Sequence, residues 1–274
     1  MENEKPVNPY QAPAVATLTA APENDPHSFI PGGRTVSVGN CWSWISAAWK
    51  LFAASPLIWI VNFVLFFIIN FIIGLIPFGS LVGIVLGPVW MAGFLYGSHA
   101  VHGGRALEVG DLFAGFREKT GPLLGLGLLT LGLWIVLFII AAILFVAVLD
   151  NSGFFTAILS QNPEAIREVI NEEAGLSFLL FFLIIMALAI PIMMAAWFAP
   201  ALVLFHDVSP IAAMSMSFKG CLRNVIPFLL YGIITFILLI LAMIPLLLGL
   251  FVVVPMLYIA IYTSYRDIFT ASDH

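Results

Sequence analysis

Four side chains with the chemistry of metal ligands lie at the ends of two long apolar runs. His99 and His102 are three residues apart at one end, and His206 precedes Asp207 at the other. Were the two ends to meet, they would offer enough ligands for zinc. No HExxH or CxxC spacing accompanies them, and interfacial His and Asp often cap helices. The sequence therefore predicts neither a metal site nor a cofactor.

Catalytic constellations of other kinds are also missing from the sequence. Serines occur near the same apolar ends, but no GxSxG motif marks one as a nucleophile, and no P-loop or dinucleotide-binding glycine motif is present. We therefore expect a protein that is not an enzyme and has no catalytic residues. An interfacial enzyme would require the histidine-bearing ends to converge.

Two amides stand out as polar groups inside the first long apolar run. Asn62 and Asn70 need hydrogen-bond partners if that run crosses a membrane, because hydrocarbon supplies none. They either hold neighbouring helices together or line a polar pocket. Neither can relay a proton, and the apolar runs contain no Asp, Glu, Lys or Arg, which argues against ordinary ion-coupled transport.

Small residues recur at four-residue spacing along the second apolar run, where they would let another helix approach closely. The options are packing within the chain, dimerisation and a backbone-lined path. The glycines concerned are Gly79, Gly83, Gly87, Gly93 and Gly97.

The N-terminal region contains a candidate partner-binding motif, Asn8-Pro9-Tyr10-Gln11-Ala12-Pro13. A tyrosine between prolines favours the extended polyproline II conformation, which docks into aromatic grooves at low entropic cost. The alternative is a solubilising tail that binds nothing.

The composition is that of a membrane protein, with 62% hydrophobic and 9% charged residues. A membrane-spanning helix needs about 20 apolar residues. Six stretches qualify, and they run over residues 57–76, 80–99, 121–149, 176–205, 225–245 and 247–265.

Basic residues predict the orientation of these spans. Nine of the ten Lys and Arg residues would lie on one side of the membrane, and Arg167 alone on the other. By the positive-inside rule both termini are cytoplasmic. We expect a disordered tail at 1–38, a transmembrane domain at 39–266 with an acidic external loop at 150–175, and a C-terminal tail at 267–274. The net charge of −5 gives no indication of nucleic-acid binding.

A weak internal repeat suggests three similar units. A short amphipathic stretch and a proline (Pro56, Pro122 or Pro227) precede each odd-numbered span. The first stretch carries Trp42, Ile45, Trp49 and Phe52 at helical spacing, as expected of an interfacial helix. The predicted fold is an all-α, polytopic membrane helical bundle. Its six transmembrane helices would form three hairpins, each preceded by an interfacial amphipathic helix.

The chain resembles a family of uncharacterised six-span inner-membrane proteins of proteobacteria over about residues 40–266. More distantly, it is similar to the membrane domain fused to some glycerophosphodiester phosphodiesterases, whose catalytic domain has no counterpart here. The first resemblance rests on Trp42-x-Trp44-Ile45, Trp49-Lys50-Leu51-Phe52, Gly104-Arg105, Leu107-Glu108-Val109 and Leu112-Phe113-Ala114-Gly115-Phe116. The second rests on Phe198-Ala199-Pro200-Ala201-Leu202-Val203 and the segment 214–219.

These observations favour a multi-pass protein of the bacterial inner membrane that organises or assists other membrane components. Its expected partners are membrane lipids, other membrane proteins or further copies of itself, and no nucleic acid. The main alternative is a passive channel or a handler of lipids or other hydrophobic small molecules.

Overall fold

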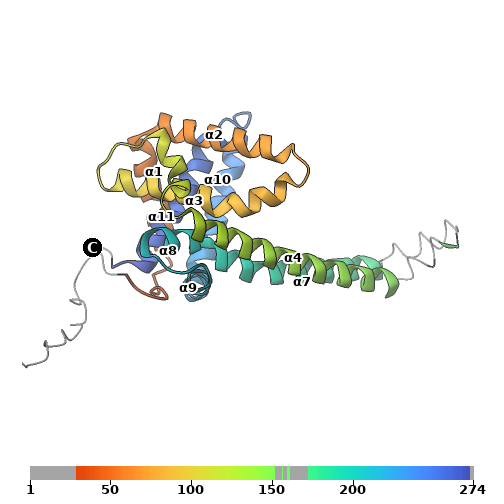
Figure 1. The fold of residues 1–274 in the computed structure, drawn as a ribbon. Helices are drawn as coiled ribbons and strands as arrows, with labels where there is room; N and C mark the ends of the chain where they lie inside the picture. Colours follow the sequence, from red (N-terminus) through yellow and green to blue (C-terminus); the bar gives the residue numbers. More distant parts are fainter. Residues whose placement is uncertain (1–28, 152–155, 157–158, 161–171, 272–274) are drawn as a thin grey trace, which may run out of the picture.

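Every regular element in the described residues is a helix, which confirms the all-α prediction. The structure, a computed structural model, describes residues 29–151, 156, 159–160 and 172–271. The elements, shown in Figure 1, are α1 (Asn40–Ala54), α2 (Pro56–Gly74), α3 (Gly79–His102), the 3-10 helix η1 (Val109–Phe116), α4 (Thr120–Asn151), α7 (Glu172–Trp197), α8 (Ala199–His206), α9 (Pro210–Arg223), α10 (Val225–Met243) and α11 (Leu250–Phe269).

Several of these helices have the length and apolar character of membrane spans. The sixth predicted span, 247–265, corresponds to α11, which does not qualify by composition. Tyr262, Ser264 and Arg266 lower the mean hydropathy of its C-terminal half. Within the described residues, the five that qualify agree closely with the first five predicted spans: Pro56–Gly74, Gly79–His102, Thr120–Val148, Leu179–His206 and Val225–Met243.

Helix α11 forms the centre of the densely packed end of the molecule. It contacts α1, α2, α3 and α10, and Ile259, Ala260 and Ile268 are fully buried. Neighbouring helices rather than lipid therefore surround much of its surface. A helix in such a position does not need the uniformly apolar surface of a lipid-facing span.

The packed region extends beyond both predicted domain boundaries. Helix α11 continues past residue 266 to Phe269, and both Ile268 and Phe269 are buried. Residues 29–36 lie against this end, where Ile30 N–H donates to the Phe269 carbonyl at 2.8 Å and Arg34 N–H donates to the Ile268 carbonyl at 2.8 Å. The segment preceding α1 therefore belongs in part to the folded domain.

Each short element that precedes a long helix packs mainly against a helix other than the one that it precedes. Helix α1 packs on α11, η1 on α3, and α9 on α7. The last contact is polar at its centre, because the Ser217 hydroxyl donates to the Met194 carbonyl at 2.6 Å and accepts from Phe198 N–H at 2.9 Å. The three contacts are not equivalent, because α1 packs on the last long helix of the chain whereas η1 and α9 pack on helices that come before them.

The predicted apolar stripe of α1 does not coincide with the face that α1 buries against the other helices. Ile45 and Phe52 are buried, but Trp42 is 65% exposed and Trp49 is 51% exposed. The helix turns Trp44 inward instead, where its indole N–H donates to an Asp267 carboxylate oxygen at 2.7 Å. That hydrogen bond, to a residue more than 200 positions away, could not be seen in the local periodicity of α1.

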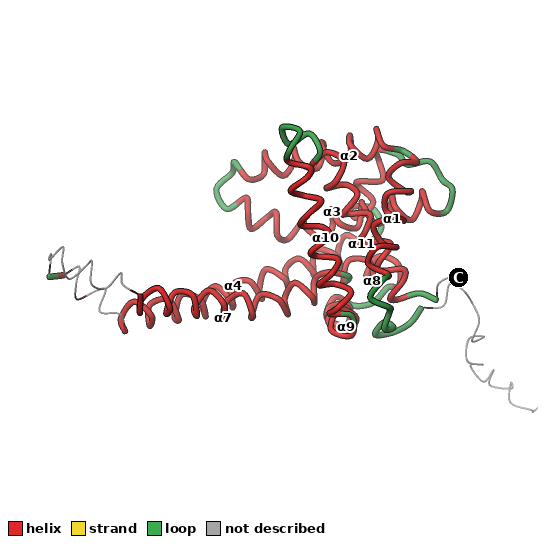
Figure 2. The backbone as a smooth tube through the Cα atoms, turned by 180° about the vertical axis from the view of Figure 1, so that it is seen from behind, coloured by secondary structure: helices red, strands yellow, loops and turns green. Residues whose placement is uncertain are grey.

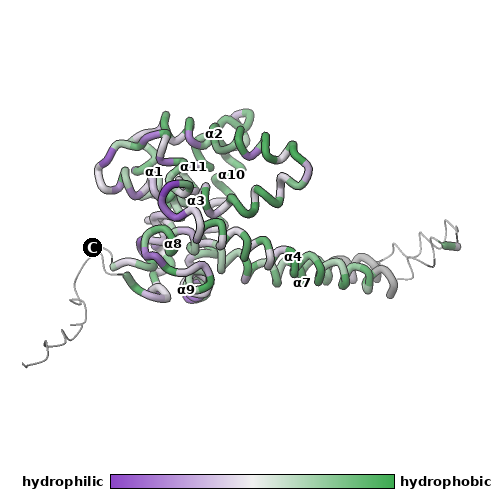
Figure 3. The backbone as a smooth tube through the Cα atoms, viewed as in Figure 1, coloured by the Kyte–Doolittle hydropathy of each residue, from purple (hydrophilic) through white to green (hydrophobic). Residues whose placement is uncertain are grey.

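Helices α4 and α7 lie side by side and project beyond the rest of the molecule (Figures 1 and 2). The 32 residues of α4 correspond to about 48 Å, against a hydrocarbon thickness of about 30 Å. Figure 3 shows that the projecting pair is apolar along most of its described length. Most of the predicted external loop 150–175, including its short acidic helix, lies outside the described residues.

Candidate functional site

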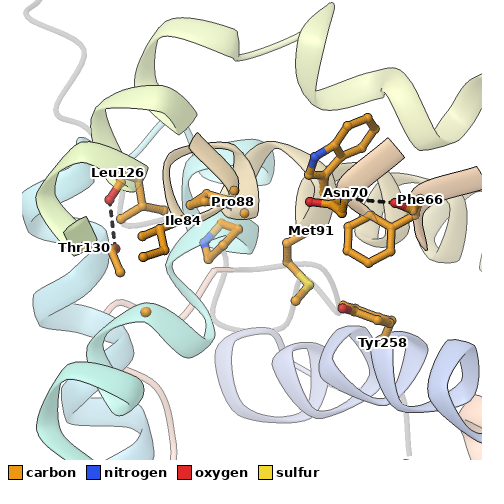
Figure 4. Close-up of a pocket in the computed structure, with 13 residues that line it drawn as sticks. Phe66, Asn70, Ile84, Pro88, Met91, Leu126, Thr130 and Tyr258 are labelled. Carbon is orange, nitrogen blue, oxygen red and sulfur yellow. Dashed lines mark hydrogen bonds between the residues drawn. The ribbon is translucent and has the colours of Figure 1, made fainter. Parts of the chain in front are cut away.

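A cavity of about 300 Å³ lies where α2, α3, α4, α7, α8 and α11 meet. Figure 4 shows that its wall is mostly apolar, with Phe66, Ile84, Met91 and Leu126 among the residues that line it. This volume is at the lower end of the range for small-molecule sites, and a largely apolar wall with a few polar groups is typical of them.

Helix α3 leaves room for the cavity because its side chains are small there. A Cβ atom added to Gly83 or to Gly87 would meet no atom within 4 Å. Both glycines line the cavity, as does Pro88, which cannot donate a backbone hydrogen bond inside the helix. A stretch predicted as a helix-packing surface is therefore open in this part of α3.

Two of the polar side chains at the cavity are satisfied by their own helices. Asn70 Nδ2 donates to the Phe66 carbonyl at 2.9 Å, and the Thr130 hydroxyl donates to the Leu126 carbonyl at 2.9 Å (Figure 4). Both bonds span one helical turn. Asn70 lines the cavity, as the polar-pocket alternative from the sequence requires.

Trp90 contributes the polar atom that lacks a partner. Its side chain lines the cavity and is 4% exposed, yet its indole Nε1 has no hydrogen-bond acceptor among the described residues. The ring is fixed edge-on against Phe66, Phe113 and Phe116. An indole N–H can only donate, so this position favours a ligand atom that accepts.

Asn62 lies two turns from Asn70 on the same helix but has different surroundings. It is 2% exposed, is not among the residues that line the cavity, and its Nδ2 lies 3.5 Å from the Glu108 carbonyl, at the limit of hydrogen bonding. Its Oδ1 has no partner in the described residues. The contact ties α2 to the loop before η1, which is the helix-connecting alternative.

The remaining predicted glycines have other surroundings. An added Cβ at Gly93 would lie 2.0 Å from the Leu112 carbonyl oxygen of η1, and at Gly97 it would lie 2.8 Å from Leu107 Cδ1. Gly79 sits in the turn between α2 and α3, where a Cβ would lie 1.7 Å from the Ile73 carbonyl oxygen. Two glycines thus allow close contact between elements, and the third allows a tight turn.

The histidines raised as candidate metal ligands have separate partners. His99 Nδ1 lies 3.1 Å from the Tyr262 hydroxyl, and His206 Nε2 contacts the Tyr265 hydroxyl. Asp207 pairs with Lys119. The described residues contain no group of three His, Cys, Asp or Glu side chains that could hold a metal ion.

The tail motif of Asn8, Pro9, Tyr10 and Pro13 lies outside the described residues. Sequence reasoning did not single out Trp90, Thr130 or Tyr258, which the structure brings to the cavity from α3, α4 and α11. A usable signal for Trp90 was its place two residues after Pro88, beside glycines that open the helix surface. Thr130 and Tyr258 carried no such local signal.

Comparison with known proteins supports the membrane character of the chain. A protein of Burkholderia thailandensis described as a probable inner membrane protein is 31% identical over 209 residues, which cover 73% of this chain and 74% of the relative. This chain belongs to the same family. The family described as predicted integral membrane protein (DUF2189) matches residues 78–195, which include all of α3, η1 and α4. No solved structure matches the chain.

The chain is therefore an integral membrane protein, which agrees with the first resemblance noted in the sequence. The more distant similarity to the membrane domain of glycerophosphodiester phosphodiesterases stays a prediction. Within the family match, α3 supplies Gly83, Gly87 and Trp90 to the cavity, and α4 supplies Thr130.

Proposed function

We propose that this membrane protein binds a hydrophobic small molecule or lipid in the cavity between α3 and its neighbours. The observation that carries the proposal is the buried, unpartnered Trp90 N–H at a mostly apolar wall. An N–H group without an acceptor is costly in a medium that cannot form hydrogen bonds. A bound carbonyl, ether or hydroxyl oxygen removes that cost.

The chemistry of the wall favours binding over catalysis. Its polar groups are an indole, an amide and hydroxyls, and the lining residues include no carboxylate, histidine or thiol. These last groups are the usual acids, bases and nucleophiles of enzymes. We therefore propose a non-enzymatic role, with a molecule that has one polar acceptor and an apolar body as ligand.

A cavity-filling variant tests the proposal. In Gly87→Leu the new side chain occupies the space of the ligand, and in the matched control Gly132→Leu it projects from α4 into space that is equally open. Mass spectrometry of the purified proteins is expected to detect a bound molecule in the wild type and the control and to lose it in Gly87→Leu. The same amount of bound molecule in all three proteins, or no bound molecule in the wild type, would refute the proposal.

Trp90→Phe tests the hydrogen bond separately from the volume. It removes the donor, and we expect the affinity for the molecule to fall by about tenfold, the value of one hydrogen bond of roughly 1.4 kcal/mol. An unchanged affinity would show that the indole N–H does not contact the ligand.

We further propose that the chain crosses the inner membrane six times as three hairpins, with α11 as the sixth span and both termini in the cytoplasm. The basic-residue asymmetry supports this topology. Terminal fusions to a reporter active only in the cytoplasm and to one active only in the periplasm test it. Periplasmic activity at either terminus would contradict the proposed orientation.

A second candidate function, organising other membrane components, is favoured by the α4–α7 pair. Only 6% of the most apolar stretch of Thr120–Val148 is buried, against 39% of that of α3. The pair therefore offers long apolar surfaces to lipid, to another membrane protein or to a second copy of the chain. Crosslinking in native membranes tests this role. A partner captured through α4 supports this role. Loss of partners when Tyr10 and Pro13 are changed to Ala would show that the tail motif also takes part in binding.

A further inference from the structure

A second pocket of about 380 Å³ lies between α1 and the C-terminal end of α11. Unlike the lining of the central cavity, its lining includes basic side chains, beside polar ones and the apolar Trp44, Ala47 and Leu51. Ser43 and Lys50 come from α1, His102 from the last turn of α3, and Arg266 and Asp267 from α11. We call it the basic pocket.

The carboxylate in the basic pocket is already neutralised. Asp267 Oδ1 accepts from Arg34 Nη2 at 2.8 Å, and its Oδ2 accepts from Asn40 Nδ2 at 2.8 Å and from Trp44 Nε1 at 2.7 Å. Each oxygen therefore has a donor, and Arg34 balances the negative charge. The charges left facing the pocket are those of Lys50 and Arg266.

These two cations differ in what holds them. Arg266 contacts His102 and lies in the last turn of α11, where a cation also offsets the negative end of the helix. Lys50 lies within α1, is exposed, and forms no ion pair with any residue that the structure describes. Its charge therefore serves no evident structural purpose in the folded chain.

The exposed tryptophans of α1 indicate the depth of the basic pocket in the membrane. Trp42 and Trp49 are seven residues apart and share one face of the helix, next to the face of Ser43 and Lys50. Exposed tryptophans prefer the headgroup level of a bilayer. We therefore infer that the pocket lies at the depth of the lipid phosphates.

We propose that the basic pocket binds the phosphate group of an anionic phospholipid, with Lys50 and Arg266 as the cations and the Ser43 hydroxyl as a further donor. Basic pockets beside transmembrane helices at the headgroup level are suited to such headgroups. A free phosphate ion offers the same chemistry but lacks acyl chains that would hold it at the membrane surface. The proposed site does not depend on a ligand in the central cavity.

Native mass spectrometry of the full-length protein in detergent, titrated with phosphatidylglycerol, tests the site. Lys50→Gln is expected to bind this lipid about fivefold more weakly, the effect of one surface cation on an anionic headgroup. Lys219→Gln, on the exposed surface of α9 outside the pocket, is the matched control and is expected to bind like the wild type. Equal binding by the two variants would overturn the proposal.

Two further measurements distinguish a lipid phosphate from a free phosphate ion, and the basic pocket from the central cavity. Phosphatidylcholine is expected to bind Lys50→Gln and the wild type alike, and millimolar inorganic phosphate is expected to leave phosphatidylglycerol bound. Displacement by inorganic phosphate would identify a soluble anion as the ligand and reject the lipid. Gly87→Leu, which fills the central cavity, is expected to retain phosphatidylglycerol, and loss in that variant would contradict two independent sites.

Discussion

The two halves of α3 have the same glycine spacing and opposite surroundings. Before Pro88, Gly83 and Gly87 face open space at the central cavity. After it, Gly93 and Gly97 are in close contact with the segment 107–112. A four-residue glycine spacing therefore specifies a smooth helix face, and the neighbouring element decides whether that face packs or borders a cavity.

The two amides of α2 repeat this contrast beside α3. Asn62, next to the loop before η1, is buried against protein, and Asn70, two turns further along α2, lines the cavity. The part of the molecule near η1 is thus filled, and the part near α4 and α8 is hollow. A protein built only to pack its helices would gain stability by filling the second region as well.

Gly93→Ala gives the largest expected effect. The new Cβ would lie 2.0 Å from the Leu112 carbonyl oxygen, and a backbone atom cannot move away without shifting η1. We expect the free energy of unfolding in detergent micelles to fall by about 3 kcal/mol. Gly132→Ala on α4 is the control, and a variant as stable as that control would show that the α3–η1 contact is not tight.

Gly97→Ala is expected to have an intermediate effect. Its nearest neighbour, Leu107 Cδ1 at 2.8 Å, is the end of a flexible side chain, although Trp59 at 3.3 Å limits the movement. The same unfolding measurement should show a loss of about 1.5 kcal/mol. A loss as large as that of Gly93→Ala would mean that Leu107 cannot move.

Asn70→Leu separates ligand binding from stability. The amide donates to its own helix, so its removal should lower the free energy of unfolding by about 1 kcal/mol or less. At the same time the amount of bound molecule should decrease, because a polar group leaves the cavity wall. A severe loss of stability with full ligand content would place Asn70 in the same role as Asn62.

Gly87→Ala has the smallest expected effect and the opposite sign. One methyl group at an open position removes the flexibility of glycine without a clash, which should raise the free energy of unfolding by about 0.5 kcal/mol. A thermal unfolding curve compared with Gly93→Ala checks this directly. Destabilisation would imply that Gly87 is in contact with a neighbouring helix after all.

The sequence predicted the helical class, the membrane setting and the ends of α2, α4 and α10 to within a few residues. Apolar runs of this length have one local solution, since a helix satisfies every backbone hydrogen bond within the segment. The start of α9 is local in the same way, because Ser209 is the N-cap residue and Pro210 the first residue of the helix. These features depend on residues close together in the chain.

Contacts between distant residues decided the rest. Nothing in the local pattern distinguishes Gly87 from Gly93, predicts that Trp44 turns inward to Asp267, or brings Tyr258 to the wall beside Trp90. Lipid drives apolar segments to be helical but barely distinguishes one apolar face from another. Which faces meet, and where they leave space, therefore depends on side-chain shape and on a few polar pairs that only the folded chain brings together.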